Sequence, residues 1–261
     1  MRGAATHNGA GSIAYVIDPR FAGGTSAAVA EELRAVATTQ ARIEVACIAS
    51  GMFRGREIAP VLADALDDCG LVPVWDPEVI AAERVILHNP AFLKFDTAVA
   101  PRIVARELIV VTHENPLRPT GEQAFDLAHC LALIDRASLA AGKWLAPISA
   151  HNRDTLRRWL DRPGGAWGWR LSARDWFNIC NFEMRPPARR PADRRGRHSR
   201  AGYEKFPPLA DMDACFPAAA KASVILAADT FLADGPARPH WPPPAFVALP
   251  RPALLGGIPL P

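Results

Sequence analysis

Short apolar runs alternate with segments of helical spacing over the first part of the chain. Each apolar run is only a few residues long and ends near Gly, Pro, Asn or Asp, which is typical of buried strands. The predicted strands are 13–17, 43–48, 71–75, 84–88, 107–112 and 144–148. Because most of these runs are apolar throughout, they favour a parallel sheet that is covered on both faces.

The segments between these strands have apolar residues three and four positions apart, which is the spacing of an amphipathic helix. The predicted helices are 25–36, 57–69 and 152–160. Gly70 directly follows the second of them, where a glycine often closes the last helical turn. This alternation of strands and helices predicts an α/β fold, a Rossmann-like doubly wound parallel sheet.

The pattern weakens after residue 160. The sequence DRPGGAWG at 161–168 predicts a linker, and short apolar runs at 176–179 and 223–227 predict further strands. The stretch 236–261 is Pro-rich and is expected not to continue regular structure. The chain is therefore divided into a flexible N-terminus at 1–11, a Rossmann-like first domain at 12–175, a partial second α/β domain at 176–235 and a Pro-rich tail at 236–261.

Composition narrows the class of protein. A net charge of +3 on 261 residues argues against a general nucleic-acid-binding protein. The five cysteines form no Cys-x-x-Cys pair and no secretion signal precedes them, which predicts reduced thiols, no zinc site and a cytoplasmic protein. No apolar run reaches the roughly 18 residues that a membrane span needs, although peripheral contact with the inner face of the membrane stays open.

Polar residues and glycines follow the predicted strands, where open parallel sheets bind ligands. They are Asp18, Gly23, Gly24, His88, Asn89, His113, Glu114 and Asn115. Gly23 and Gly24 allow a ligand to approach the backbone and the start of a helix. The loop fits neither the GxGxxG nor the GxxxxGK pattern, however, so its spacing favours a tight turn between strand and helix. An imidazole at His113 is a candidate base or partner of a substrate hydroxyl, and the alternative is a histidine that caps local backbone. Glu114 either tunes the pKa of His113 or is simply solvated.

A second candidate site is the basic segment RRGRHSRAGYEKFP at 194–207. It carries five cations, Arg194, Arg195, Arg197, Arg200 and Lys205. Guanidinium and ammonium groups together suit a diphosphate, whereas the alternative is a solvated linker. The nearby Asp-x-Asp at 211–213 has the oxygen ligands that divalent metals prefer, but it follows no clear apolar strand, so no metal site is predicted.

Four segments resemble, in their order along the chain, motifs of the two-domain (GT-B) glycosyltransferases of group 1, which are retaining enzymes that use nucleotide sugars. They are VIDPRFAGGTSAAVAEEL at 16–33, IVVTHENP at 109–116, APISAHNRDTLRRW at 146–159 and GRHSRAGYEKFP at 196–207. This resemblance implies transfer of a sugar from a nucleotide-diphosphate sugar to the hydroxyl of a carbohydrate or lipid-linked acceptor, with retention at the anomeric carbon.

The resemblance also implies roles for residues. His113 is the expected active-site residue that contacts the transferred sugar. No cofactor is expected. The donor-phosphate group is expected to comprise Arg197, Lys205, Arg200, Gly23 and Gly24. Further substrate contacts are expected at His88, Asn89, Glu114 and Asn115.

The chain departs from this family after Glu183. Fewer than the roughly 100 residues that a second domain needs follow it, and the family's later Glu-x7-Glu motif is absent, since no Glu follows Glu204. We therefore expect the first domain to fold and the chain to transfer sugar poorly or not at all. Two alternatives remain open, a non-catalytic Rossmann-like module that binds phosphates or other anions, and a nucleotide-binding Rossmann enzyme of different chemistry.

Overall fold

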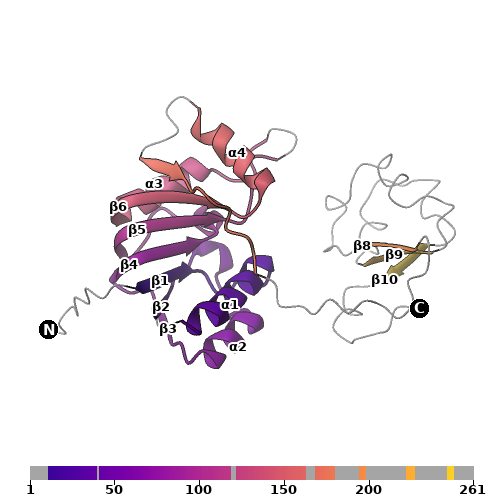
Figure 1. Ribbon diagram of the computed structural model, residues 1–261, viewed down its shortest axis with the longest axis horizontal. Helices are drawn as coiled ribbons and strands as arrows, with labels where there is room; N and C mark the ends of the chain where they lie inside the picture. Colours follow the sequence, from indigo (N-terminus) through magenta and orange to yellow (C-terminus); the bar gives the residue numbers. More distant parts are fainter. Residues whose placement is uncertain are drawn as a thin grey trace. The chain divides into compact units, whose positions relative to one another are not determined.

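The computed structural model describes residues 11–39, 41–118, 122–162 and 168–179, together with the backbone of three short strands farther along the chain. The chain divides into two compact units, Met1–Phe182 and Glu183–Pro261 (Figure 1). Among the described residues, no helix combines the length and the apolar character that crossing a membrane requires.

The first unit is built on an open sheet of seven parallel strands in the order β3-β2-β1-β4-β5-β6-β7. The strands are β1 (Ser12–Ile17), β2 (Arg42–Cys47), β3 (Pro73–Trp75), β4 (Val79–His88), β5 (Arg102–Thr112), β6 (Ser138–Pro147) and β7 (Trp169–Leu171). Every pair of neighbours is parallel. The predicted α/β class with a Rossmann-like parallel sheet is thus confirmed.

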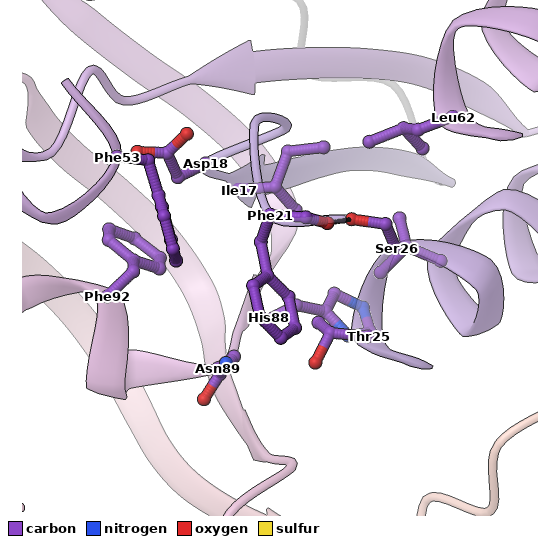
Figure 2. Close-up of a pocket in the computed structure, with 11 residues that line it drawn as sticks. Ile17, Asp18, Phe21, Thr25, Ser26, Phe53, Leu62, His88, Asn89 and Phe92 are labelled. Carbon is purple, nitrogen blue, oxygen red and sulfur yellow. Dashed lines mark hydrogen bonds between the residues drawn. The ribbon is translucent and has the colours of Figure 1, made fainter. Parts of the chain in front are cut away.

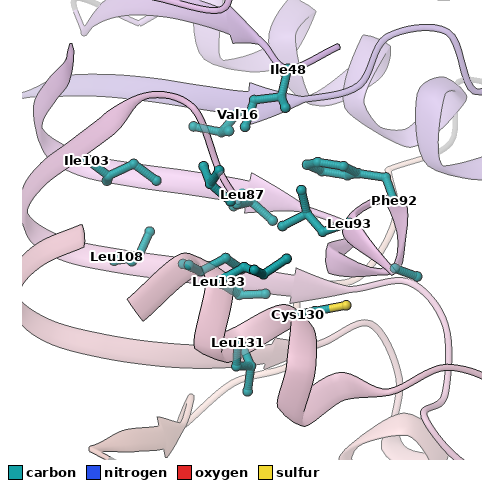
Figure 3. Close-up of a cluster of buried hydrophobic side chains, with 14 of the residues drawn as sticks. Val16, Ile48, Leu87, Phe92, Leu93, Ile103, Leu108, Cys130, Leu131 and Leu133 are labelled. Carbon is teal, nitrogen blue, oxygen red and sulfur yellow. The ribbon is translucent and has the colours of Figure 1, made fainter. Parts of the chain in front are cut away.

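Helices cover both faces of this sheet (Figure 1). They are α1 (Gly24–Ala37), α2 (Pro60–Asp68), α3 (Leu127–Ala137) and α4 (Ala150–Leu160), with the short 3-10 helices η1 (Gly51–Phe53) and η2 (Pro90–Leu93). Alternate residues of each strand point to opposite faces. On β1, Tyr15 and Ile17 join the core under α1 and α2, whereas Ala14 and Val16 join the core under α3 and α4. Figure 3 shows this second core, in which Leu131 and Leu133 of α3 lie over the strands.

The central strands are longer than the apolar runs predicted. β4, β5 and β6 begin before residues 84, 107 and 144, where the predicted strands start. The first halves of these strands were missed because their charged and small residues hide the strand pattern. The pairing of β4 with β5 continues on both sides of Glu83 and Arg106, whose side chains form an ion pair at 3.2 Å. Charged residues can therefore lie inside a paired strand that apolar content alone does not reveal.

One predicted strand is wrong. Residues 176–179 form no strand, because the edge position beside β6 is taken by β7, which pairs Trp169 with Lys143. The Trp176 backbone N–H instead donates to the Pro147 carbonyl at the end of β6, at 2.6 Å. This contact places the Trp176 side chain over the same sheet face as α1.

The helices also differ from the prediction in two places. The predicted 57–69 helix begins at Pro60, which suits a first helical position, and Gly70 follows it with a φ of +63°. Helix α3 was not predicted. Its first turn is capped by Asp126, whose carboxylate accepts a hydrogen bond from the His129 N–H at 3.0 Å.

The described part of the second unit is a parallel sheet in the order β10-β9-β8. Its strands are β8 (Arg194–Arg197), β9 (Ala222–Leu226) and β10 (Phe246–Leu249). Strand β9 confirms the strand predicted at 223–227. Strand β10 corrects the interpretation of 236–261 as a tail without regular structure, because four consecutive residues between its prolines can pair.

Candidate functional site

The strand order reverses between β1 and β4, because the chain runs outward from β1 to β2 and β3 and then returns to the other side of β1. Ligands of open α/β sheets bind at such a point, beyond the carboxyl ends of the strands. A pocket lies there, and Figure 2 shows its lining. Its polar lining comes from β1, the start of α1 and the end of β4, namely Asp18, Thr25, Ser26, His88 and Asn89.

The Gly23–Gly24 turn begins α1 without a side-chain cap. Gly23 has an extended φ of −165°, so its backbone does not require glycine. The space around Gly23 does require glycine, because a Cβ there would lie 2.6 Å from Cζ of Phe21. A Cβ on Gly24 meets nothing within 4 Å. Gly23 thus has a packing role beside Phe21, while Gly24 borders open space at the first turn of α1.

His88 and His113 lie together at the ends of neighbouring strands. Nδ1 of His88 is 3.0 Å from Nε2 of His113, and the two rings are tilted by 38°. Burial lowers the pKa of His113 to about 3, and electrostatic repulsion between protons on the two neighbouring rings acts in the same direction. His113 is therefore neutral near pH 7. Glu114 is exposed and is not the cause of this shift.

A carboxylate that was not predicted as a site residue completes this cluster. Glu32 of α1 is 8% exposed, and it accepts hydrogen bonds from Tyr15 Oη at 3.0 Å and from Trp176 Nε1 at 2.8 Å. Its Oε2 is also 3.7 Å from Nε2 of His88. Burial acts to raise the pKa of Glu32, but His88, Trp176 and Tyr15 together hold it below its ordinary value. The carboxylate is therefore charged inside the core.

A signal for Glu32 was present in the sequence. It lies three positions after Val29 and next to Leu33 on the apolar face of the predicted helix. A carboxylate on a buried helical face needs a partner. That partner could not be named, because Trp176 is distant in sequence and lay in a segment predicted to be a strand.

The two asparagines of the edge differ in their surroundings. Asn89 has a left-handed backbone with a φ of +57°, and its buried side-chain oxygen has no hydrogen-bond partner in the described part of the chain. Asn115, in contrast, accepts from Asn152 Nδ2 at 2.7 Å, and Asn152 accepts from Thr112 Oγ1 at 2.7 Å. Asn115 thus ties the end of β5 to α4, whereas the Asn89 oxygen makes no such contact with the described residues.

Asp18 is fully engaged in the fold. Its carboxylate accepts hydrogen bonds from Nε and Nη2 of Arg20, at 2.9 and 2.7 Å, and from the hydroxyl of Ser50 at 2.6 Å. These contacts join the loop after β1 to the loop after β2. Asp18 therefore shapes one wall of the pocket.

The structure brings together at this edge the predicted residues Gly23, Gly24, His88, Asn89, His113, Glu114 and Asn115, all in the first unit. Arg197 ends β8 in the second unit. Arg200, Lys205 and the 211–213 motif lie outside the described residues, so the predicted donor-phosphate group is not tested. Within the described ranges, no cluster of His, Cys, Asp or Glu side chains could hold a metal ion.

Comparison of the sequence with protein-family models finds no matching family, and comparison with curated proteins finds no match. Function is therefore inferred from the chemistry of the carboxyl edge and from the motifs of the chain.

Proposed function

We propose that this chain is a cytoplasmic, retaining glycosyltransferase-like protein of the GT-B type, which binds a nucleotide-diphosphate sugar and an acceptor hydroxyl and transfers the sugar poorly or not at all. The observation that supports this best is the His88–His113 pair beside the start of α1, at the point where the strand order reverses. In this proposal the first unit binds the acceptor and the transferred sugar, and the second unit binds the donor phosphates.

His113 suits contact with a sugar because it is neutral and partly exposed at the sheet edge. A neutral imidazole forms a hydrogen bond with a hydroxyl without the cost of burying a charge. Asn89, which follows His88, adds an amide oxygen that has no hydrogen-bond partner among the described residues and lines the same pocket as the first turn of α1. Hydroxyl-rich ligands match this set of uncharged donors and acceptors.

Departure of the nucleoside diphosphate builds negative charge, which the second unit is proposed to offset. Arg197 and Lys205, with Arg200 as a further candidate, would stabilise this charge by about 3 kcal/mol per contact. A cation pair can act here without a metal, as the resemblance implies.

Binding of nucleoside diphosphates and nucleotide sugars to the whole chain, measured by calorimetry, tests the donor site. Arg197→Ala and Lys205→Ala should each weaken binding at least about tenfold, whereas Arg190→Ala, a matched loss of charge outside the motif, should not. Equal losses in all three variants that vanish in salt would instead identify a general anion-binding module. Saturable binding of NAD without any binding of sugar nucleotides would point to a different Rossmann enzyme.

Transfer itself is a separate measurement, made by following sugar release to water or to hydroxyl acceptors. If His113 contacts the transferred sugar, His113→Ala should reduce any transfer by about tenfold or more while leaving diphosphate binding unchanged. A His113→Ala variant with the wild-type rate would exclude this role for His113.

A further inference from the structure

Glu32 faces donor groups from three other parts of the first unit. Tyr15 belongs to β1, His88 ends β4, and Trp176 follows β7. Tyr15 and Trp176 donate to separate oxygens of the carboxylate, at 3.0 and 2.8 Å. Both carboxylate oxygens are thereby fixed in place, and Oε2 faces Nε2 of His88.

The same two aromatic residues hold the His88 ring. Tyr15 stacks on it with centroids 5.9 Å apart and planes 14° apart, and Trp176 meets it edge-on at 6.4 Å. The side chain of His88 is 1% exposed, so water does not compete for its ring nitrogens. This packing keeps Nε2 toward Glu32 and Nδ1 toward His113.

The position of the carboxylate decides where His88 carries its proton. A lone pair on Nε2 would face the negative oxygen of Glu32 at 3.7 Å, whereas an N–H there is attracted to it. In the neutral ring, Nδ1 of His88 is then the acceptor. At 3.0 Å it must receive the proton of Nε2 of His113.

We propose that Glu32, acting through His88, fixes His113 in the tautomer that has its proton on Nε2 and its lone pair on Nδ1. His113 then meets a ligand as a hydrogen-bond acceptor, which selects a hydroxyl or amine donor and disfavours a carbonyl or phosphate oxygen. Glu32 and His88 are positioning residues in this scheme. Only the identity of the donor as a sugar hydroxyl rests on the proposed function.

Long-range ¹H–¹⁵N correlation spectra of the whole chain, labelled at histidine, test this directly at a pH near 7.5. Signals of the two rings are assigned by their loss in His88→Asn and His113→Asn. We expect protonated Nε2 and unprotonated Nδ1 in both rings. A proton on Nδ1 of His113, or protons on both nitrogens of His88, overturns the proposal.

Glu32→Gln tests the charge of the carboxylate, because Trp176 can only donate and so holds the amide oxygen toward His88 while the negative charge is removed. We expect the ¹⁵N shifts of His113 to move toward the average of the two tautomers. Glu31→Gln is the matched control, since Glu31 is the neighbouring residue and pairs with Arg34 instead. Unchanged His113 shifts in a folded Glu32→Gln variant would remove Glu32 from the scheme.

These spectra need no substrate, so they separate this inference from the proposed function. If the chain shows the expected tautomer but binds no sugar nucleotide, the positioning of His113 by Glu32 and His88 stands and the proposed function is refuted. If the chain transfers sugar but shows the opposite tautomer, only the positioning of His113 is refuted.

Discussion

His113 makes the stability of the first unit depend on pH. Its pKa in the folded state is about 3, whereas its ordinary value is 6.5, so the unfolded chain takes up the proton first as the pH falls. The free energy of unfolding should therefore fall by up to about 1.4 kcal/mol per pH unit below pH 6.5. His113→Asn should lose this dependence in urea unfolding measured between about pH 7 and pH 5.

Two features isolate this effect from others. The lowered pKa of Glu32 also makes stability fall with pH, but only below its ordinary value of 4.5, which lies outside the tested window. His151 is exposed, so His151→Asn should keep the wild-type slope. Parallel curves for wild type and His113→Asn would mean that His113 titrates normally in the folded chain.

The glycines that open α1 should respond differently to the same substitution. Gly23→Ala places a Cβ 2.6 Å from the Phe21 ring, whereas Gly24→Ala meets nothing within 4 Å. Displacing a packed aromatic ring costs about 1–3 kcal/mol, so only Gly23→Ala should lower the unfolding midpoint markedly. Gly24→Ala should leave stability nearly unchanged and, if donor phosphate lies over this turn, weaken diphosphate binding. Equal midpoints for the two variants would show that Phe21 moves freely.

At the scale of elements, one ion pair lies in the loop after β1, and both of its partners are hydrogen-bonded to Ser50 in the loop after β2. Asp18 and Arg20 have side chains that are 1% and 11% exposed, so removing the carboxylate leaves a buried guanidinium without its counter-charge. Asp18→Ala should lower the free energy of unfolding by about 3–5 kcal/mol. Arg42→Ala, which breaks the exposed pair with Glu44, should cost about 1 kcal/mol or less in the same denaturation experiment. A small loss in Asp18→Ala would mean that Arg20 finds another partner.

Elements were predictable where one local signal sufficed. Strand β1 is apolar throughout and α1 has helical spacing, so both were predicted nearly to their observed bounds. The starts of β4 and β5 were not predicted, because the charged residues Glu83 and Arg106 interrupt the apolar pattern while the residues on either side of them pair. Likewise, the segment that begins at Trp176 has the apolar composition of a strand, but it forms none because β7 already pairs with the edge of β6.

In the whole molecule, too, the sequence predicted which residues reach the same edge but not which of them touch. The position of His88 and His113 at one edge followed from two strands ending in His and Asn before Pro, since parallel strands share their carboxyl edge. Their direct contact at 3.0 Å, and the part of Glu32 in fixing His88, depend on how α1 and the segment after β7 pack on the sheet. Periodicity specifies which residues are buried, but it does not specify which buried residues meet.

The division into two compact units predicts that the first unit folds without the second. The His88–His113 pair, Glu32 and both cores of the seven-stranded sheet lie within Met1–Phe182, so this part should fold alone. A chain ending at Phe182 should unfold cooperatively in urea and keep the wild-type ¹⁵N shifts of His113. In the proposed function, the donor phosphates bind Arg197 and Lys205 of the other unit. The short chain should therefore lose nucleoside-diphosphate binding in calorimetry while keeping its fold. If it binds diphosphate as tightly as the whole chain does, the phosphate site belongs to the start of α1, and the second unit has a different role.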